Sequence, residues 1–194
     1  MRLIVITGTD FVPHEARFIR RMLAEGIERV HLRKPGACRQ DICRLLESLP
    51  CELYPRLSLH DELPLAEHYG LGGVHLNARN PQPPCGFRGR ISRSCHTRGE
   101  LAACRHKTDY RFLSPIFDSI SKQGYRAAFS AQDLRAAQDE IDADTFALGG
   151  VLPQRLPLLK EYGFGGAVLL GYIWQDSDLD KLSQRLELLR KYAL

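Results

Sequence analysis

The sequence lacks any apolar stretch long enough to cross a membrane. No uninterrupted apolar run approaches the roughly 20 residues that a membrane-spanning helix needs. The first residues, MRLIVITGTD, contain too short an apolar part for a secretory signal and indicate a first strand instead. We therefore expect a cytoplasmic protein that has no membrane partner.

Closely spaced cysteine pairs are also missing. The chain has 6 cysteines, but none of them forms a CxxC pair, and most fall within helix or strand patterns. An even number would permit disulfides. Without a secretory signal, however, reduced thiols are the expected state.

The charge balance gives little support for a nucleic-acid partner. The formal net charge is only +4, which suits a small anionic substrate. Arg17, Arg20 and Arg21 form the one notable basic group, and their helical spacing is better explained by a solvated helix face. We expect no nucleic-acid binding.

No linker or internal repeat divides the chain. The composition does not change along the 194 residues, and no period typical of a solenoid occurs. This length fits one domain that can bury a core of its own. We therefore expect a single domain over residues 1–194.

What the sequence does contain is a regular alternation of strand and helix patterns. Short apolar segments predict eight strands, at residues 3–7, 29–32, 57–59, 73–76, 90–95, 110–113, 145–148 and 166–170. Amphipathic segments predict seven helices, at residues 15–25, 41–49, 63–69, 97–105, 130–141, 154–162 and 178–192. The connection at residues 77–89 is rich in proline, glycine and arginine and has no helix signals.

This alternation predicts the fold class. Alternating strands and helices imply parallel strands joined by right-handed crossovers. Eight such units predict an α/β fold, a compact (β/α)8 TIM barrel whose fourth helix is shortened or missing. A doubly wound open sheet is the alternative.

Polar residues follow most of the predicted strands, where barrels place their catalytic groups. The segment at residues 109–124 offers two hydroxyls and an ammonium in one loop, at Ser119, Ser121 and Lys122. These groups suit a phosphate or diphosphate, although a solvated loop would have the same composition. Arg33 and Lys34, after the second strand, would add charge to a second phosphate or else be surface cations.

Glycines follow the last two strands, where barrels commonly bind phosphate through backbone N–H groups. These are Gly149 and Gly150 after the seventh strand and Gly171 after the eighth. A simple turn would also explain each of them. The prediction is that they contact a substrate phosphate.

His96 is the predicted general acid/base, because imidazole alone titrates near neutral pH without perturbation. Alternation along the strand places Ser94 on the same side as His96 and Cys95 on the other side, as buried packing. His75 lies inside a strand and is interpreted as a packing histidine. Asp61 is a candidate ligand for Mg²⁺, which is normally held by one or two carboxylates with substrate phosphates.

Six segments, in this order and spacing, resemble the thiamine phosphate synthase and TenI family over nearly the whole chain. They are VHLRK (30–34), LHDELPLAEHYGLGGVHL (59–76), SRSCHTRGEL (92–101), DYRFLSPIFDSISKQG (109–124), FALGGV (146–151) and GFGGAVLLGYI (163–173). The family has a compact (β/α)8 barrel and is usually a dimer. The resemblance therefore implies a homodimer that acts on phosphorylated small molecules.

Thiamine phosphate synthases join an aminopyrimidine diphosphate to a thiazole phosphate and release pyrophosphate with Mg²⁺. The resemblance assigns the matching positions as follows: Arg33 for the arginine after strand two, Asp61 for the metal-binding aspartate, Ser94 for the serine before a histidine, and Ser119, Ser121 and Lys122 for the diphosphate loop. The family's second metal carboxylate would fall at residues 77–80, where the chain has no acid. The strand-two motif also begins with His31 in place of glutamine, and it has Pro35 in place of the closing lysine.

TenI-type proteins share the fold but catalyse a proton shift that aromatises a carboxythiazole phosphate. His96 occupies the position of their acid/base histidine, and a strand-two motif that begins with histidine is also TenI-like. This chemistry needs a phosphate anchor and a proton shuttle, but no metal-bound diphosphate. The sequence therefore favours a thiamine-biosynthesis enzyme of the tautomerase type. The synthase is the alternative, and a ligand-binding barrel without catalysis is a third possibility.

Overall fold

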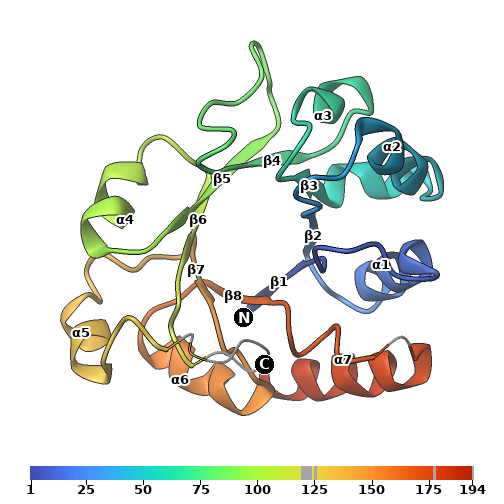
Figure 1. Cartoon of the computed structure of the whole chain (residues 1–194). Coiled ribbons are helices and arrows are strands. Elements are labelled where there is room, and N and C mark those ends of the chain that lie inside the picture. Colours follow the sequence, from blue (N-terminus) through green and yellow to red (C-terminus); the bar gives the residue numbers. More distant parts are fainter. Residues whose placement is uncertain (119–123, 125, 177, 194) are drawn as a thin grey trace.

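The computed structural model describes residues 1–118, 124, 126–176 and 178–193. Within this part of the chain, eight parallel strands close into a barrel in chain order (Figure 1). The strands are β1 (Arg2–Ile6), β2 (Arg29–Leu32), β3 (Leu57–Leu59), β4 (Gly73–Leu76), β5 (Arg90–Cys95), β6 (Tyr110–Leu113), β7 (Thr145–Leu148) and β8 (Gly166–Leu169). The pairing of β1 with β8, from Arg2 opposite Gly166 to Val5 opposite Leu169, closes the ring. The barrel prediction is confirmed, and the open-sheet alternative is wrong.

Seven α-helices surround the barrel in the described residues (Figure 1). They are α1 (Glu15–Ala24), α2 (Arg39–Glu47), α3 (Pro64–His68), α4 (Arg98–Cys104), α5 (Ala131–Ala136), α6 (Leu156–Glu161) and α7 (Leu179–Ala193), with 3-10 turns η1 (Cys51–Arg56) and η2 (Pro153–Arg155). The fully described connection from β4 to β5 contains no helix. The predicted loss of the fourth helix is therefore confirmed.

Local sequence signals explain where several helices begin. Thr97 caps α4 by accepting a hydrogen bond from the Glu100 N–H at 3.1 Å, and Ser130 forms a reciprocal capping box with Asp133 at the start of α5. Helix α5 is shorter than predicted: it ends at Ala136, whereas the predicted helix extends to residue 141. The chain continues in tight turns, in which the Glu140 N–H donates to the Ala137 carbonyl at 2.9 Å.

Different sets of side chains pack on the outer and inner sides of the barrel strands. Apolar side chains between strands and helices form the larger core, and a smaller apolar cluster inside the barrel consists of Ile4, Ile6, Tyr110, Phe112, Phe146 and Val168. The rest of the interior is polar. His31, Ser58, His75 and Ser92 are buried there with at most 2% of their surface exposed.

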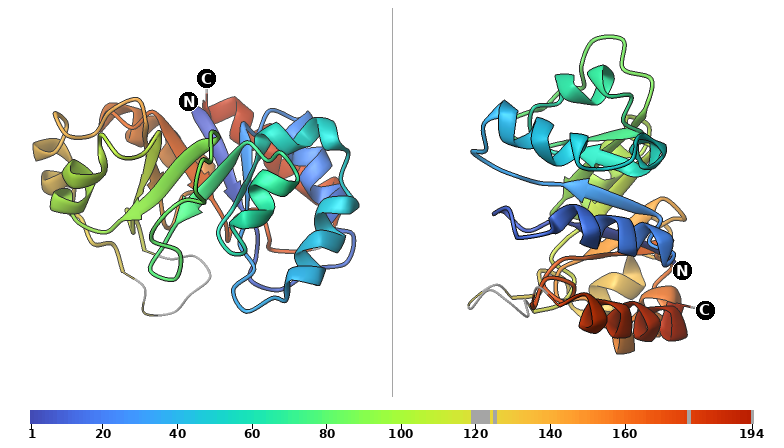
Figure 2. Two further views of the ribbon diagram at one scale, coloured as in Figure 1. Left: turned by 90° about the horizontal axis from the view of Figure 1, so that it is seen from above. Right: turned by 90° about the vertical axis from the view of Figure 1, so that its right-hand side faces the viewer.

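The two ends of the barrel differ in the chain segments they carry. The loops that follow the strands project to one side, and both chain termini lie on the opposite side (Figure 2). We call the face formed by the C-terminal ends of the strands the barrel mouth. In the described residues, no helix combines the length and apolar character that a membrane crossing requires.

Candidate active site

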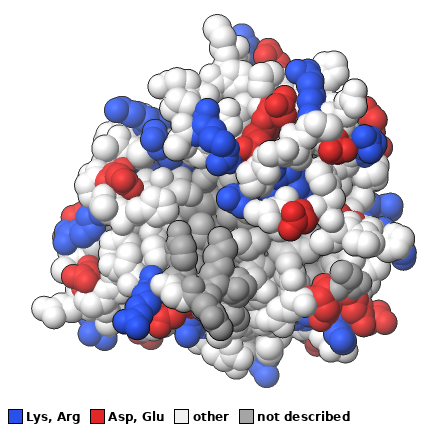
Figure 3. Space-filling view, in the orientation of Figure 1, with Lys and Arg blue, Asp and Glu red and all other residues white. Residues whose placement is uncertain are grey.

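The barrel mouth brings together several of the predicted site residues. Arg33 follows β2, Asp61 follows β3, and His96 follows β5. On this face, Lys and Arg side chains lie near the centre, beside the residues drawn in grey (Figure 3). Ser119, Ser121 and Lys122, predicted to bind diphosphate, lie outside the described residues.

The Ser94 hydroxyl is held by a buried histidine. Its Oγ lies 3.0 Å from His75 Nε2, and His75 Nδ1 lies 2.9 Å from Ser92 Oγ. Ser92 Oγ donates to the Val74 carbonyl at 3.3 Å, so it accepts from His75 Nδ1–H, and the other ring nitrogen accepts the Ser94 proton. The lone pairs of Ser94 are then free to accept a hydrogen bond from a substrate N–H group.

Burial keeps His75 uncharged. Its removal from solvent, with the positive charges of Arg33 and Arg93, lowers the pKa of His75 to about 3. At neutral pH the ring is therefore a fixed hydrogen-bond acceptor and not a proton carrier. The prediction of a packing histidine is confirmed by its 2% exposure, but its contact with Ser94 also gives it a place beside the site.

Two further histidines lie in the same interior. His31 Nδ1 is 2.9 Å from His60 Nε2, and His31 Nε2 is 2.7 Å from the Tyr110 hydroxyl. The His60 and His75 rings stack with their centroids 4.1 Å apart. Burial, above all, lowers the pKa of His31 and of His60 well below the ordinary value. The sequence patterns did not reveal this cluster, because the residues come from three separate strand units.

His96 lies on the exposed rim and has a defined tautomer. Its Nδ1 is 3.0 Å from the Ser114 carbonyl, which can only accept, so Nδ1 carries the proton. Its Nε2 forms no hydrogen bond with the described residues, which leaves a lone pair free to take a proton. His96 bonds toward β6 and Ser94 toward β4, so no hydrogen bond joins them.

Cys95, between these two residues, does not contribute a nucleophile. It is fully buried, as predicted. Burial, together with the neighbouring Cys104, raises the pKa of the Cys95 thiol to about 12. The reactive thiolate is therefore not populated at neutral pH.

One carboxylate oxygen of Asp61 accepts hydrogen bonds within the described residues, and the other does not. Arg79 donates to Asp61 Oδ1 through Nη2 at 2.7 Å and through Nε at 3.1 Å. Asp61 Oδ2 is buried and has no hydrogen-bond partner among the described residues. A buried carboxylate oxygen without a partner is costly, and a cation would satisfy it.

The Asp61 carboxylate fits Mg²⁺, because this ion is held by one or two carboxylates together with substrate phosphates and waters. Asn77 does not add a ligand. Its Oδ1 already accepts from the N–H groups of Arg79 and Asn80, at 2.9 and 3.0 Å, and its Nδ2 donates to the His60 carbonyl. Asp61 would thus be the carboxylate ligand that this part of the mouth supplies.

Arg33 is placed for an anion. It is half-buried, its N–H donates to Thr7 Oγ1 at 2.9 Å, and its guanidinium forms no hydrogen bond or ion pair with the described residues. Its charge helps to lower the pKa values of His60 and His75. A guanidinium beside two neutral imidazoles can bind phosphate oxygens in a bidentate manner.

Lys34 does not share this role, and the prediction that it binds phosphate is wrong for this structure. Its side chain is 1% exposed, and its ammonium donates to the Gly8 carbonyl at 3.0 Å, the Asp10 carbonyl at 2.7 Å and Glu15 Oε1 at 2.7 Å. An ammonium has three donors, and all of them are used within the protein.

The glycines after β7 allow the backbone to approach the loop after β6. Gly149 and Gly150 have φ values of +100° and +61°, and a Cβ on Gly150 would lie 2.2 Å from the Asp118 carbonyl oxygen. None of the hydrogen bonds within the described chain uses the N–H groups of Gly149, Gly150 or Gly171. With no partner among the described residues, these donors could meet an anion.

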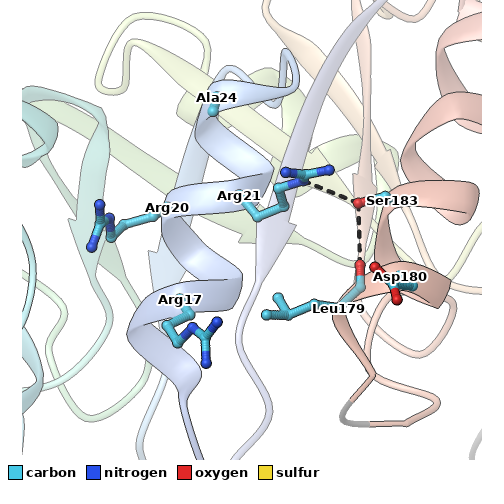
Figure 4. Close-up of a pocket in the computed structure, with 7 residues that line it drawn as sticks. All are labelled: Arg17, Arg20, Arg21, Ala24, Leu179, Asp180 and Ser183. Atoms are coloured by element: carbon cyan, nitrogen blue, oxygen red, sulfur yellow. Dashed lines mark hydrogen bonds between the residues drawn. The ribbon is translucent and has the colours of Figure 1, made fainter.

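A second hollow lies away from the mouth, between α1 and α7 (Figure 4). Arg17, Arg20 and Arg21 line it and are exposed, as the prediction of a solvated helix face requires. Arg21 Nε donates to Ser183 Oγ at 3.0 Å. This hollow shares no residue with the mouth.

Comparisons with known proteins identify the family and agree with the fold. The family model described as "Thiamine monophosphate synthase" matches residues 3–173. A putative thiamine-phosphate synthase of Geobacter sulfurreducens is 30% identical over 165 residues, which cover 80% of this chain and 78% of the relative. A thiamine-phosphate synthase of Syntrophomonas wolfei is 26% identical over 87% of this chain and 85% of the relative.

A solved structure is also similar over the full length. The crystal structure of thiamine phosphate pyrophosphorylase from Bacteroides thetaiotaomicron has a TM-score of 0.89 and 36% identity, and the match covers 100% of this chain and 98% of that chain. The Pyrococcus furiosus structure titled thiamine phosphate pyrophosphorylase, with a TM-score of 0.80 and 19% identity over 99% of this chain and 95% of that one, supports the fold alone. The chain belongs to the thiamine monophosphate synthase family and is an enzyme of thiamine biosynthesis.

Proposed function

We propose that the protein is a thiamine-phosphate synthase, which joins an aminopyrimidine diphosphate to a thiazole phosphate and releases pyrophosphate. The observation that carries this proposal is the pair of uncommitted groups that follow the neighbouring strands β2 and β3. These are the Arg33 guanidinium and the buried Asp61 Oδ2. An anionic diphosphate and its cation would satisfy both. The names of the bacterial relatives support the synthase over the tautomerase that the sequence favoured.

In this proposal, a different group of mouth residues binds each part of the two substrates. Arg33 would bind the diphosphate, and the loop residues Ser119, Ser121 and Lys122 would contribute to the same group. Ser94 would accept a hydrogen bond from the pyrimidine amino group. The free N–H groups of Gly149, Gly150 and Gly171 would bind the thiazole phosphate.

Mg²⁺, held by Asp61 and the diphosphate, would neutralise charge on the leaving pyrophosphate. The protein's own contribution is mainly electrostatic and positional. When the bond between carbon and diphosphate oxygen breaks, the electron pair leaves with the pyrophosphate, and Arg33 stabilises the added charge. His75 fixes the direction of the Ser94 hydroxyl, which orients the pyrimidine toward the incoming thiazole nitrogen.

The test is direct formation of thiamine phosphate from the two substrates and Mg²⁺. We expect turnover by the native chain and a loss of at least about 100-fold in kcat/KM for Asp61→Asn, because the cation loses its carboxylate ligand. Asp180→Asn, an exposed acid on α7, is the matched control and should keep full activity. Failure of the native protein to form thiamine phosphate would reject the proposal.

The tautomerase is the second candidate, and the geometry of His96 favours it. A protonated Nδ1 that bonds to the Ser114 carbonyl leaves Nε2 as a base on the rim. Conversion of the carboxythiazole phosphate to its aromatic isomer would support this activity if His96→Gln abolishes it. His68→Gln, on α3, is the control. The sensor alternative requires tight binding of thiazole or thiamine phosphate with neither reaction.

The assembly and location of the protein belong to the same proposal. We also propose that the protein is a cytoplasmic homodimer; the family resemblance implies the dimer. Light scattering coupled to size-exclusion chromatography would give the mass of the particle, and a monomer at working concentration would contradict the dimer.

A further inference from the structure

Three histidines meet inside the barrel beneath the mouth. They come from adjacent strands: His31 lies in β2, His60 directly follows β3, and His75 lies in β4. One ligand nitrogen from each lies within 4.8 Å of the others, and the three residues are 0%, 4% and 2% exposed. We infer that this histidine cluster binds a transition-metal ion of the zinc class through imidazole nitrogens, without the proposed Mg²⁺ ligand Asp61.

His31 and His60 already point two ring nitrogens at each other, as two ligands of one metal ion would be placed. Their facing nitrogens are 2.9 Å apart and share one proton, so one of the two always presents a lone pair to the other. A metal replaces that proton. The displaced proton moves to the opposite nitrogen of His60, for which the described residues provide no hydrogen bond, so all three rings stay neutral.

The distances lie close to those of a tetrahedral site. Zinc–nitrogen bonds of about 2.0–2.1 Å separate the ligand nitrogens by roughly 3.4 Å. The observed separations, from 2.9 Å to at most 4.8 Å, bracket this value. The His60 and His75 rings stack at an interplanar angle of 17°, so both must rotate to direct their lone pairs at one ion.

Groups around the cluster fix the outer nitrogens. The Tyr110 hydroxyl, 2.7 Å from His31 Nε2, can accept its proton, and Ser92 Oγ accepts from His75 Nδ1. Metal-binding histidines generally donate their second N–H in this way, which directs the other nitrogen to the ion. Imidazole ligands select zinc, copper, cobalt or nickel, whereas Mg²⁺ prefers oxygen. His75 would bind the ion through Nε2, the nitrogen that accepts from Ser94 in this structure, so metal binding would release the Ser94 hydroxyl.

The experiment uses the full-length protein, stripped with EDTA and desalted. Titration with Co²⁺ should produce a saturable visible absorption at one equivalent, without the near-ultraviolet band of thiolate ligation, and Zn²⁺ should abolish it while Mg²⁺ does not. We expect His31→Gln and His60→Asn to weaken Co²⁺ binding at least about 100-fold and Tyr110→Phe by about 10-fold. His68→Gln, an exposed histidine on α3, should bind as the native protein does.

Thermal unfolding provides a second measurement that does not use activity. Zn²⁺ should raise the Tm of the native chain and of His68→Gln, because it binds only the folded state, but it should not raise that of His31→Gln. The Tm of metal-free His31→Gln shows whether the variant is folded. No visible band, a thiolate band, or equal binding by the cluster variants would overturn the inference.

Discussion

At the scale of single residues, the Ser94 hydroxyl depends on His75 for its direction. Ser94→Ala should lower kcat/KM for thiamine phosphate formation about 10-fold, near 1.4 kcal/mol, because one hydrogen bond to the pyrimidine is lost. The decrease should appear mainly in KM for the pyrimidine substrate. Ser183→Ala, on α7, is the control (Figure 4). An unchanged KM in Ser94→Ala would show that this hydroxyl does not contact the substrate.

The buried pair of Lys34 and Glu15 gives a prediction for stability. Lys34→Met leaves the Glu15 carboxylate buried without its cation, so the free energy of unfolding at pH 7 should fall by about 3–5 kcal/mol. Adding Glu15→Gln should restore much of this loss. Urea unfolding of the single and double variants, with the exposed Lys191→Met as control, measures both effects.

The same pair has a pH dependence of defined sign. Burial, which outweighs the opposing hydrogen bond from Lys34, raises the pKa of Glu15. A carboxyl group whose pKa is higher in the folded state is least destabilising below its unfolded value and becomes costly as the pH rises. The destabilisation of Lys34→Met should therefore be smaller at pH 4 than at pH 7. A larger loss at pH 4 would contradict this account.

The sequence could not show that Lys34 is buried, because its partners come from another part of the chain. A lysine before Pro35-Gly36 is typical of an exposed turn. Its acceptors are the loop carbonyls of Gly8 and Asp10 and the first residue of α1. Only the closure of β1 against β2 brings that loop over the lysine.

At the scale of elements, the turn after β7 supports the loop after β6. Phe117 N–H donates to the Gly149 carbonyl at 3.1 Å, and Gly150 lies against Asp118. Gly150→Ala adds a Cβ that would meet the Asp118 oxygen at 2.2 Å, so this loop must move. We expect a loss of at least about 10-fold in kcat/KM from displacement of the loop.

Gly163→Ala separates this clash from backbone strain. Gly163 also has a positive φ, +88°, but its added Cβ would meet nothing closer than 3.7 Å. It should cost about 1–2 kcal/mol of stability from the left-handed conformation and leave kcat/KM unchanged. Equal activity losses in the two variants would show that strain alone explains the Gly150 effect.

Strand and helix positions were predictable because each element carries its own periodic pattern and flanking turn residues. Segment 110–113 and the capped start of α4 at Thr97 are examples. The histidine cluster was not predictable in this way. His31, His60 and His75 each occur at or near a strand end, but their meeting depends on parallel register across β2, β3 and β4. A repeated histidine on consecutive predicted strands was the available signal.

At the scale of the whole molecule, closure of the barrel depends on the contact between the first and last strands. Helix α7 covers this part of the barrel and buries Leu182, Leu186 and Leu189. The N-terminal ammonium donates to the Ala193 carbonyl at 2.5 Å, so the two ends of the chain meet. The side chain of Trp174, between β8 and α7, donates to the Ile6 carbonyl at 2.8 Å at the end of β1.

Trp174 is the only tryptophan of the chain, so its fluorescence reports on the contact that closes the barrel at β1. Leu186→Ala should lower the free energy of unfolding by about 2–5 kcal/mol, because a fully buried leucine leaves a cavity, whereas the half-buried Leu179→Ala should cost less. If closure is cooperative, tryptophan fluorescence and far-ultraviolet circular dichroism will change at the same urea concentration in both variants. In Leu186→Ala, the tryptophan signal could instead be lost at a lower urea concentration than the helical signal. That result would show that the β1–β8 contact opens separately and that α7 dissociates while the rest of the barrel stays folded.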